Sequence, residues 1–423
     1  GPLVASRRNS AGSRRRGGSQ RLGASFLPEV QLDKRSAASV RAGHPWVWPD
    51  SLEEPGALPP LGSEVVLLDS IGSFLGRALV DEGRGPALRV FSRDERDPPL
   101  RKLLFRRVAS AKALRERILD TGTDAYRLLH GEGDRLPGLV VDRYGPVLVL
   151  RPDGPLWDRH LKLVVEALRS EAGPGVRTIL HKPRSGDASV LWGELSSGDL
   201  VVTEEGRRYL VRPGQGQKTG FFLDQRVTRS LVQRLVQPGD RSLNLFSFTG
   251  GFSVAMGLGG AAEVTSVDLS ASIMDDVRAQ FPLNGLPTAD HHFIAADIFE
   301  WLPAQAKAAA RGGANAPRPY DLIVCDPPAL ARKRTQLDKA RGAYRKLHAN
   351  LAPLLARDSL LVTCSCTARL GLDELFEDAR DGLLQAGRRV GRVVYRGSAG
   401  GDHPTAPGFP DPHYLSCLVL SVD

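Results

Sequence analysis

Starting at Asn244, the chain reads Asn-Leu-Phe-Ser-Phe-Thr-Gly-Gly-Phe, a short apolar strand that runs into a turn with two adjacent glycines. Glycines after a strand let the backbone approach a ligand closely. The turn is not the G-x-G-x-x-G motif of dinucleotide binding, and no lysine or arginine accompanies it to hold a pyrophosphate. It therefore favours a nucleoside ligand without a pyrophosphate. The alternative is a tight turn that binds nothing.

From residue 240 onward, apolar strand segments alternate with helical segments. The predicted strands are Ser242–Ser247, Val264–Asp268, His292–Ala296, Tyr320–Cys325 and Ser359–Cys364, with two late strands near Arg389–Tyr395 and Tyr414–Leu420. Near-continuous apolar runs are typical of a parallel sheet covered by helices on both faces. The two late strands are expected to pair antiparallel at its edge. Such a sheet binds ligands beyond the carboxyl ends of its strands.

Acidic residues follow three successive strands of this predicted sheet. Asp268 ends the second strand, 18 residues beyond Gly250, where a carboxylate can accept both hydroxyls of a ribose. Asp297 follows the third strand and can accept an adenine amino group, and Asp326 follows the fourth. Each acid alone is equally explained as a helix N-cap. Together they predict a polar ligand that crosses this edge of the sheet.

The fourth strand opens into Asp326-Pro327-Pro328-Ala329, and the fifth leads into Cys366. The prolines fix the backbone, so that a carbonyl and the carboxylate can hold a planar base. Because adjacent parallel strands lie ~4.8 Å apart, Asp326 and Cys366 are expected to face one cleft. A thiolate can add to carbon 6 of a pyrimidine and activate carbon 5 toward a sulfonium methyl group. Ala329 stands where enzymes that methylate exocyclic amines carry an aromatic residue, which counts against that reaction.

The cysteines are Cys325, Cys364, Cys366 and Cys417, and their spacing fits neither a C-x-x-C redox pair nor a structural zinc site. A chain of 423 residues can build a core without disulfides, so we expect reduced thiols, no metal and a cytoplasmic location. Residues two apart on a strand face the same side, so Cys364 can compete with Cys366. We interpret Cys364 as a small buried hydrophobe and Cys366 as the nucleophile.

The chain carries a formal net charge of +9, and its basic residues are clustered. Six arginines and no acidic residue precede Glu29, so residues 1–28 are predicted to be a disordered basic tail, which either attracts phosphate backbones or solubilises or sorts the protein. A second basic stretch surrounds Tyr344 and is interpreted as a phosphate-contacting segment, with a solvated helix face as the alternative: Arg332, Lys333, Arg334, Lys339, Arg341, Arg345 and Lys346. We therefore predict RNA as the partner.

The first half of the chain is divided by its turn signals into two small domains. Residues 29–98 contain short strands at 65–68, 74–80 and 87–91, and are predicted to form a β-rich domain, with a barrel as one form. Residues 99–212 are predicted to form an α+β domain that begins with a helix over 101–130. The α/β domain is assigned to residues 213–423. No run approaches the ~20 apolar residues that span a bilayer, and no secretory signal is visible.

These motifs resemble those of the bacterial class I methyltransferases that make 5-methylcytosine in large-subunit ribosomal RNA. The resemblance covers roughly residues 30–423. Residues 216–226 read Gly-Gln-Lys-Thr-Gly-Phe-Phe-Leu-Asp-Gln-Arg and are similar to the family's signature before the first strand of the sheet. Residues 244–252 resemble its cofactor loop, 41–47 the opening of its PUA domain, and 129–143 its middle domain. Residues 341–346 and Ser365-Cys366-Thr367 also fit.

The resemblance implies a Rossmann-like class I methyltransferase domain with a seven-stranded sheet, a PUA-like RNA-binding β-barrel and a small α+β middle domain. It implies S-adenosylmethionine as cofactor, ribosomal RNA as partner, and a possible homodimer that pairs through the N-terminal region. Cys366 and Asp326 are the predicted catalytic residues. The predicted cofactor-binding residues are Phe222, Gln225, Asn244, Phe246, Phe248, Thr249, Gly250, Asp268, Leu269, Asp297, Asp326 and Pro327. The predicted RNA-binding residues are Lys218, Arg332, Lys333, Arg334 and Tyr344.

The sequence departs from the family where Ala329 and Leu330 replace an expected Lys/Ser-Phe pair, and where Cys364 adds a thiol. Three other readings stay open. The enzyme can methylate another atom of RNA, with Cys366 as a structural residue. It can be a non-catalytic RNA-binding or ribosome-assembly factor that retains the fold. A small-molecule methyltransferase is the last of the three, because it would not need two accessory domains.

Overall fold

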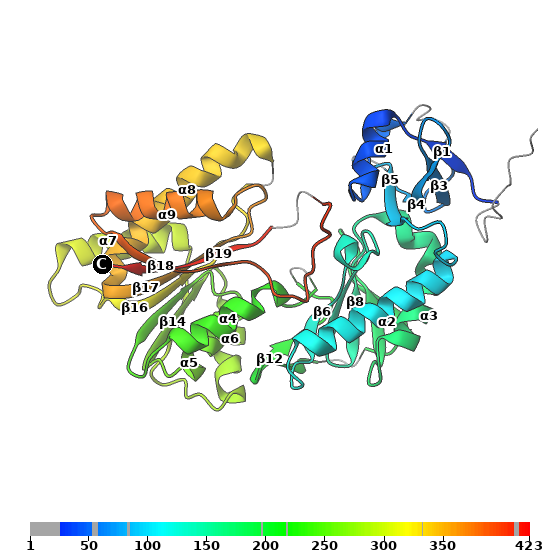
Figure 1. The fold of residues 1–423 in the computed structure, drawn as a ribbon. Helices are drawn as coiled ribbons and strands as arrows, with labels where there is room; N and C mark the ends of the chain where they lie inside the picture. The colour runs from blue at the N-terminus through cyan, green and yellow to red at the C-terminus, as the bar shows by residue number, and fades with distance from the viewer. Residues whose placement is uncertain are drawn as a thin grey trace, which may run out of the picture.

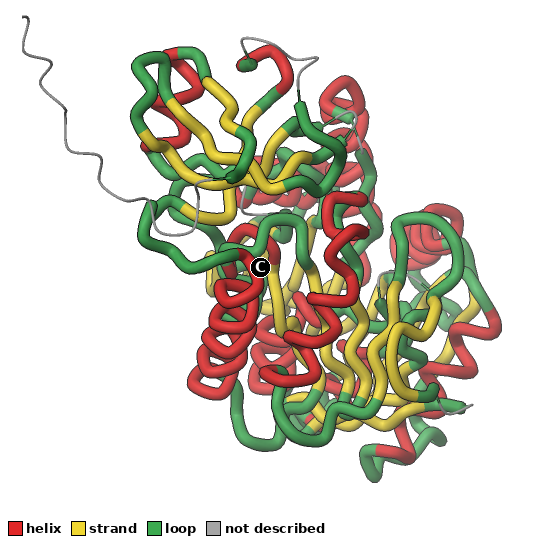
Figure 2. The backbone as a smooth tube through the Cα atoms, turned by 90° about the vertical axis from the view of Figure 1, so that its right-hand side faces the viewer, coloured by secondary structure: helices red, strands yellow, loops and turns green. Residues whose placement is uncertain are grey.

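The computed structural model describes residues 26–52, 58–82, 85–195, 198–216, 219–331, 333–409 and 414–423, without the side chain of Arg334. Of the predicted basic tail, residues 1–25 lie outside this range. The strands form a five-stranded N-terminal sheet, a five-stranded middle sheet, a two-stranded hairpin and a seven-stranded sheet. The N-terminal sheet lies at one end of the molecule, at the top of both Figure 1 and Figure 2.

The seven-stranded sheet has the order β15-β14-β13-β16-β17-β19-β18. Its strands are β13 (Arg241–Leu245), β14 (Glu263–Asp268), β15 (His292–Ala295), β16 (Tyr320–Cys325), β17 (Leu355–Ser365), β18 (Val390–Gly397) and β19 (Ser416–Val422). β13 to β17 pair in parallel, and β19 pairs antiparallel with both β17 and β18. This confirms the predicted parallel sheet and its antiparallel pair of late strands.

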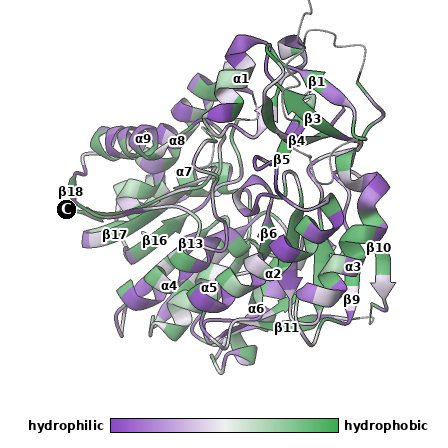
Figure 3. Ribbon diagram, turned by 45° about the vertical axis from the view of Figure 1, so that its right-hand side comes forward, coloured by the Kyte–Doolittle hydropathy of each residue, from purple (hydrophilic) through white to green (hydrophobic). Residues whose placement is uncertain are grey.

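Helices cover both faces of this sheet, as the apolar strand runs predicted. One face carries α4 (Arg226–Leu235), α5 (Gly251–Leu258) and α6 (Ala271–Leu283), and the other carries α7 (Ile298–Arg311), α8 (Leu337–Leu351) and α9 (Leu372–Gln385) (Figure 1). Each face has its own hydrophobic core. In Figure 3 the central strands are mainly hydrophobic, whereas the covering helices also display hydrophilic residues. The carboxyl ends of the parallel strands are thereby left as the accessible edge.

The N-terminal sheet has the order β1-β3-β4-β5-β2 and packs against one helix. Its elements are β1 (Glu29–Gln31), α1 (Lys34–Arg41), β2 (Trp46–Val47), η1 (Pro49–Ser51), β3 (Glu64–Leu68), β4 (Phe74–Val80) and β5 (Leu88–Ser92). The three strands that glycine spacing predicted in this region are β3, β4 and β5, within one residue at each end.

The middle sheet has the order β10-β9-β8-β7-β6 and is followed by the β11–β12 hairpin. The elements are α2 (Leu100–Ile118), β6 (Ala125–His130), η3 (Gly131–Asp134), β7 (Val140–Tyr144), β8 (Val147–Leu150), η4 (Pro155–His160), α3 (Leu161–Glu171), β9 (Thr178–His181), β10 (Ser189–Gly193), β11 (Leu200–Glu204) and β12 (Arg207–Val211). The predicted helix over 101–130 is wrong beyond Ile118. Leu119 takes an extended conformation, a turn follows at Gly122, and the chain continues as β6.

Residues 398–409, between β18 and β19, leave the seven-stranded sheet and reach the middle and N-terminal sheets; we call them the strap (Figure 1). Asp402 is fully buried and accepts hydrogen bonds from Arg226 Nη2 on α4 at 2.8 Å and from the backbone N–H of Arg127 in β6 at 3.1 Å. At the far end of the strap, the ring of Phe409 lies 4.7 Å from that of Trp46, in β2. The strap therefore connects the seven-stranded sheet with the middle and N-terminal sheets.

The hairpin is fixed to α4 by a buried ion cluster, which we call the hairpin junction. Glu204 on β11 accepts hydrogen bonds from Arg207 Nη2 at 3.0 Å and from Arg229 Nε at 2.8 Å. All three side chains are at most 2 % exposed. The guanidinium of Arg229 also lies over the ring of Phe221, 4.5 Å from its centroid.

No helix in the described part of the chain is both long enough and apolar enough to span a bilayer.

Candidate active site

The turn after β13 has an unusual backbone. Phe246 and Phe248 have positive φ angles of 58° and 47°, and Gly250 has φ of 88°. Non-glycine residues rarely adopt this region and persist there when the surroundings hold them, often at functional sites. A Cβ on Gly250 would lie 2.8 Å from Cγ1 of Val277 on α6, which is too close. The glycine is therefore required both by its backbone angle and by its packing.

The carboxylate of Asp268 holds this turn against the end of β14. Its Oδ2 accepts the backbone N–H of Phe248 at 2.8 Å, and its Oδ1 accepts the N–H of Leu269 at 2.7 Å. Nearby, Asn244 is fully buried in β13 and donates to Ser253 Oγ, but its Oδ1 has no hydrogen-bond partner within the described residues. The buried Oγ1 of Thr249 also has none there. Buried polar atoms usually have partners, so these two oxygens point to a polar ligand.

Other predicted cofactor residues surround the same turn. The ring of Phe222 meets the ring of Phe248 edge to face, with centroids 4.8 Å apart. Leu269, 71 % exposed, lies directly after Asp268. Asp297 is exposed at the end of β15, and its Oδ1 accepts the N–H of Phe299 as the N-cap of α7. The helix-cap alternative is thus realised for Asp297, while its role toward a ligand stays a prediction.

Asp326 connects to the α4 side of the sheet through Gln225. Gln225 Nε2 donates to Asp326 Oδ2 at 3.1 Å, and Gln225 Oε1 lies 3.6 Å from the sulfur of Cys417. Cys417 is the register partner of Cys364 on the neighbouring strand, and both are fully buried. The hydrogen bond with Cys417, together with burial, raises the pKa of the Cys364 thiol well above its ordinary value. Cys364 is therefore a neutral core thiol, as the sequence interpretation has it.

Cys366 lies beyond the end of β17 and, unlike the other cysteines, is partly exposed. Its sulfur is 3.9 Å from the carbonyl oxygen of Pro327, in the turn that follows Asp326. The predicted neighbourhood of Asp326 and Cys366 is therefore present, since the registered pairing of β16 with β17 brings the two strand ends together.

Tyr344 contacts the side chains on both sides of Cys366. Its hydroxyl donates to Ser365 Oγ at 2.9 Å and lies 3.1 Å from Thr367 Oγ1, which also accepts the N–H of Leu330 at 3.1 Å. Tyr344 has no exposed surface, so it lies beneath the strand end and not on a surface open to RNA. Sequence analysis missed Ser365 and Thr367 as positioning residues. The helical spacing of Ala340, Tyr344, Leu347 and Leu351 was the signal that Tyr344 faces the core.

The other predicted RNA-binding residues divide into two groups. Lys218 and Arg332 lie outside the described residues, as does the side chain of Arg334. Lys333 is exposed in the turn before α8. Farther along the basic stretch, Arg341 is neutralised, because it forms ion pairs with Glu377 at 2.8 Å and Asp378 at 3.1 Å on α9. Within the described residues, no group of three or more His, Cys, Asp or Glu side chains could hold a metal ion.

Two family models match the chain. A model of S-adenosylmethionine-dependent methyltransferases matches residues 158–386, and a model of PUA-like domains matches residues 30–93. Among curated proteins, the "Ribosomal RNA large subunit methyltransferase" of Deinococcus radiodurans is 35% identical over 417 residues, covering 95% of this chain and 99% of that protein. The "Ribosomal RNA large subunit methyltransferase I" of Shewanella amazonensis is 31% identical, covering 93% and 99%.

A solved structure has the same fold. SMU.776, a methyltransferase structure in complex with SAH, superimposes with a TM-score of 0.79 at 23% sequence identity, over 93% of this chain and 100% of that chain. The superposition agrees with the seven-stranded sheet described above. The chain therefore belongs to the family of S-adenosylmethionine-dependent methyltransferases with a PUA-like domain, to which the curated ribosomal RNA large subunit methyltransferases also belong.

Proposed function

We propose that this enzyme transfers a methyl group to carbon 5 of a cytosine in large-subunit ribosomal RNA, with Cys366 as the nucleophile. The observation that carries the proposal is the partly exposed thiol of Cys366, 3.9 Å from the carbonyl of Pro327 beside Asp326. The names of the curated relatives and the match to a PUA-like domain support ribosomal RNA as the substrate. On this proposal, the exposed Lys333 contacts phosphates of the RNA.

The residues at the carboxyl edge of the sheet fit S-adenosylmethionine. Asp268 suits ribose hydroxyls, and the unpartnered oxygens of Asn244 and Thr249 suit polar groups of a nucleoside. The rings of Phe222 and Phe248, which meet edge to face, and the backbone at Gly250 lie beside the same residues. When bound there, S-adenosylmethionine supplies an electrophilic methyl group carried on a sulfonium.

The side chains at the edge then have distinct tasks. The Cys366 thiolate adds to carbon 6 of the cytosine, which makes carbon 5 nucleophilic toward the methyl group. Asp326, held by Gln225, acts in its protonated form and donates its proton to ring nitrogen N3, which offsets the negative charge that the thiolate brings to the ring. After transfer, the proton on carbon 5 is lost to solvent, the double bond re-forms and the thiolate leaves. A base within a duplex must be flipped out to reach this edge.

The proposal is tested by methyl transfer from labelled S-adenosylmethionine to unmodified large-subunit ribosomal RNA, with transfer RNA as a second substrate. We expect label at carbon 5 of cytosine in ribosomal RNA, and its loss with Cys366→Ala. Label at another atom that persists in the variant would contradict the nucleophile and favour a structural role for Cys366. Failure to bind S-adenosylmethionine at any concentration would instead favour a non-catalytic RNA-binding factor.

A further inference from the structure

A cavity of about 230 Å³ lies where the strap passes β6, and we call it the strap pocket. Its lining includes His130 at the end of β6, Gly400 and His403 of the strap, and Tyr414 before β19. The two histidine rings are 5.0 Å apart. The cavity is smaller than the ~300–1,000 Å³ typical of sites for drug-sized ligands, and its three rings give it flat aromatic walls.

The strap pocket opens at the same edge of the seven-stranded sheet as Cys366. Ser365 of β17 is the register partner of Ser416 of β19. Because these strands are antiparallel, Cys366 after Ser365 and Tyr414 before Ser416 leave the sheet on the same side. Tyr414 also donates to Asp224 Oδ2 at 2.8 Å, and the next residue, Gln225, contacts Asp326. The strap pocket therefore adjoins the proposed catalytic cleft.

Asp402 determines which nitrogen of His403 carries the proton. Although burial opposes ionisation, the hydrogen bond to His403 and the charges around it hold the pKa of Asp402 below its ordinary value. Its carboxylate therefore accepts a hydrogen bond from His403 Nδ1 at 3.1 Å. In the neutral imidazole this leaves Nε2 as an acceptor. That Nε2 is buried and has no hydrogen-bond partner within the described residues.

A ligand that pairs with this imidazole nitrogen must supply a hydrogen-bond donor. A phosphate group presents only acceptors, so it cannot satisfy Nε2, whereas a nucleobase presents N–H donors on its edge. Aromatic rings also provide surfaces on which an unstacked base can stack. Arg226 and the backbone of β6 hold Asp402 in place, and Asp402 in turn holds His403. Such fixed positions suit a preformed binding site.

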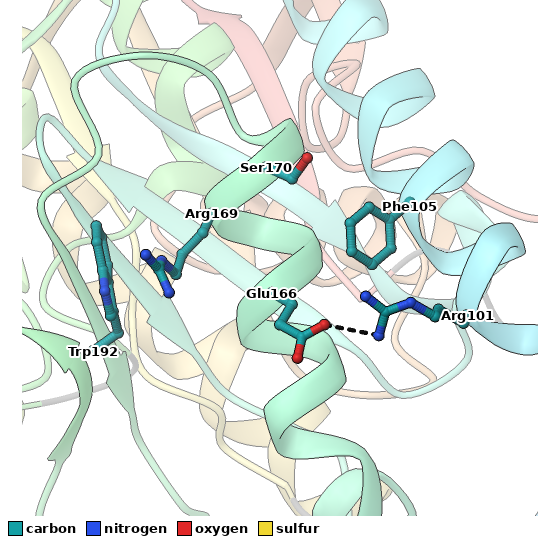
Figure 4. Close-up of a pocket in the computed structure, with 6 residues that line it drawn as sticks. All are labelled: Arg101, Phe105, Glu166, Arg169, Ser170 and Trp192. Atoms are coloured by element: carbon teal, nitrogen blue, oxygen red, sulfur yellow. Dashed lines mark ion pairs between the residues drawn. The ribbon is translucent and has the colours of Figure 1, made fainter.

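We propose that the strap pocket binds one nucleobase of the substrate RNA that flanks the target nucleotide, with His403 Nε2 accepting a hydrogen bond from the base. The inference rests on the RNA substrate proposed above. A larger hollow of about 460 Å³ between α2, α3 and β10 does not support a similar role, because its charged groups already have partners within the hollow (Figure 4). There, Arg101 pairs with Glu166 at 2.8 Å, and Arg169 lies 4.5 Å from the centre of the Trp192 ring.

Two variants test the strap pocket in the full-length protein. His403→Phe removes the acceptor and keeps an aromatic ring, and Thr405→Phe adds bulk at an exposed residue of the lining, where folding is not at risk. Thr121→Phe is the matched control, since Thr121 is an exposed threonine outside the pocket. The measurements are equilibrium binding of unmodified large-subunit ribosomal RNA and, separately, of S-adenosylmethionine.

We expect both strap variants to weaken RNA binding by about tenfold, as the loss of one base contact predicts, with unchanged affinity for S-adenosylmethionine. The control is expected to bind RNA as the wild type does. If wild type and both variants bind RNA equally, the strap pocket is not a base site, whatever the catalytic result. If the wild type binds no ribosomal RNA, the proposed function and the pocket assignment both fail.

Discussion

The carboxyl edge of the seven-stranded sheet and the hairpin junction differ in how their buried polar groups are satisfied. At the junction, Glu204 is fully buried and paired with two arginines that are themselves almost inaccessible. At the edge, Cys366 is partly exposed, and buried oxygens of Asn244 and Thr249 have no partner among the described residues. Polar groups satisfied within the chain stabilise the fold, whereas those left for a ligand carry function. Each prediction below compares the expected effects of two substitutions or of two measurements on one variant.

The largest expected effect is on methyl transfer, when Cys366 at the carboxyl edge is replaced. Cys366→Ala should lower methyl transfer by on the order of 10³-fold or more, as loss of a nucleophile does, and should leave S-adenosylmethionine affinity unchanged. Cys364→Ala, two residues away in the core, should retain turnover within a few fold. Single-turnover assays on ribosomal RNA measure both variants. If Cys364→Ala is the inactive one, the assignment of the two thiols is reversed.

At the hairpin junction, the expected loss is in stability. Glu204→Gln leaves the buried Arg229 without its counter-ion, whereas Arg207 keeps its pair with Glu205 at 3.3 Å, so the free energy of unfolding should fall by about 3–5 kcal/mol. Glu166→Gln breaks the exposed pair with Arg101 and should cost less than about 1 kcal/mol. Urea denaturation followed by circular dichroism compares them. Equal losses would show that burial does not distinguish the two pairs.

The two acids at neighbouring strand ends should differ in their effect on the cofactor. Asp268→Asn weakens the hold on the turn at Phe248 and removes the carboxylate offered to a ribose, so S-adenosylmethionine should bind about 10- to 100-fold more weakly. Asp297→Asn keeps a helix-capping side chain and should have a smaller effect. Isothermal titration calorimetry gives both dissociation constants. An equal loss of S-adenosylmethionine affinity in the two variants would contradict the different roles proposed for Asp268 and Asp297.

Tyr344→Phe tests whether the core contributes to the edge by positioning Cys366. The variant keeps the buried ring but loses the hydrogen bonds to Ser365 and Thr367. We expect kcat to fall by about tenfold, with the affinities for S-adenosylmethionine and RNA unchanged. A rise in KM for RNA at constant kcat would instead indicate that Tyr344 contacts RNA, as the sequence alone predicted.

The smallest effect concerns the basic stretch beside the edge. Lys333→Ala should weaken RNA binding a few fold and reduce the slope of log affinity against log salt by about one, as loss of one phosphate contact does. Arg341→Ala should leave that slope unchanged, because Arg341 is already paired on α9. Filter binding across a salt series measures both. Equal slopes for the two variants would contradict this division of the stretch.

Sequence patterns predict the edge better than they predict the junction. Apolar strand runs place Asp268, Asp326 and Cys366 at one edge because parallel strands end together. The contacts of the strap could not be predicted, since Arg115 donates to the carbonyl of Asp402 across 287 residues of chain. No local pattern encodes such a pairing. Strand β12 of the hairpin was not predicted, because it reads Arg-Arg-Tyr-Leu-Val and its two arginines interrupt the apolar signal.

The most direct test of the central claim is covalent trapping on RNA in which cytidine is replaced by 5-fluorocytidine. Fluorine on carbon 5 cannot leave as a proton does, so the thioether at carbon 6 persists after methyl transfer. With S-adenosylmethionine present, we predict a stable protein–RNA complex for the wild type and Cys364→Ala, with the modified peptide containing Cys366, and none for Cys366→Ala. A methylated product without any covalent complex, or a complex that survives in Cys366→Ala, would contradict the account.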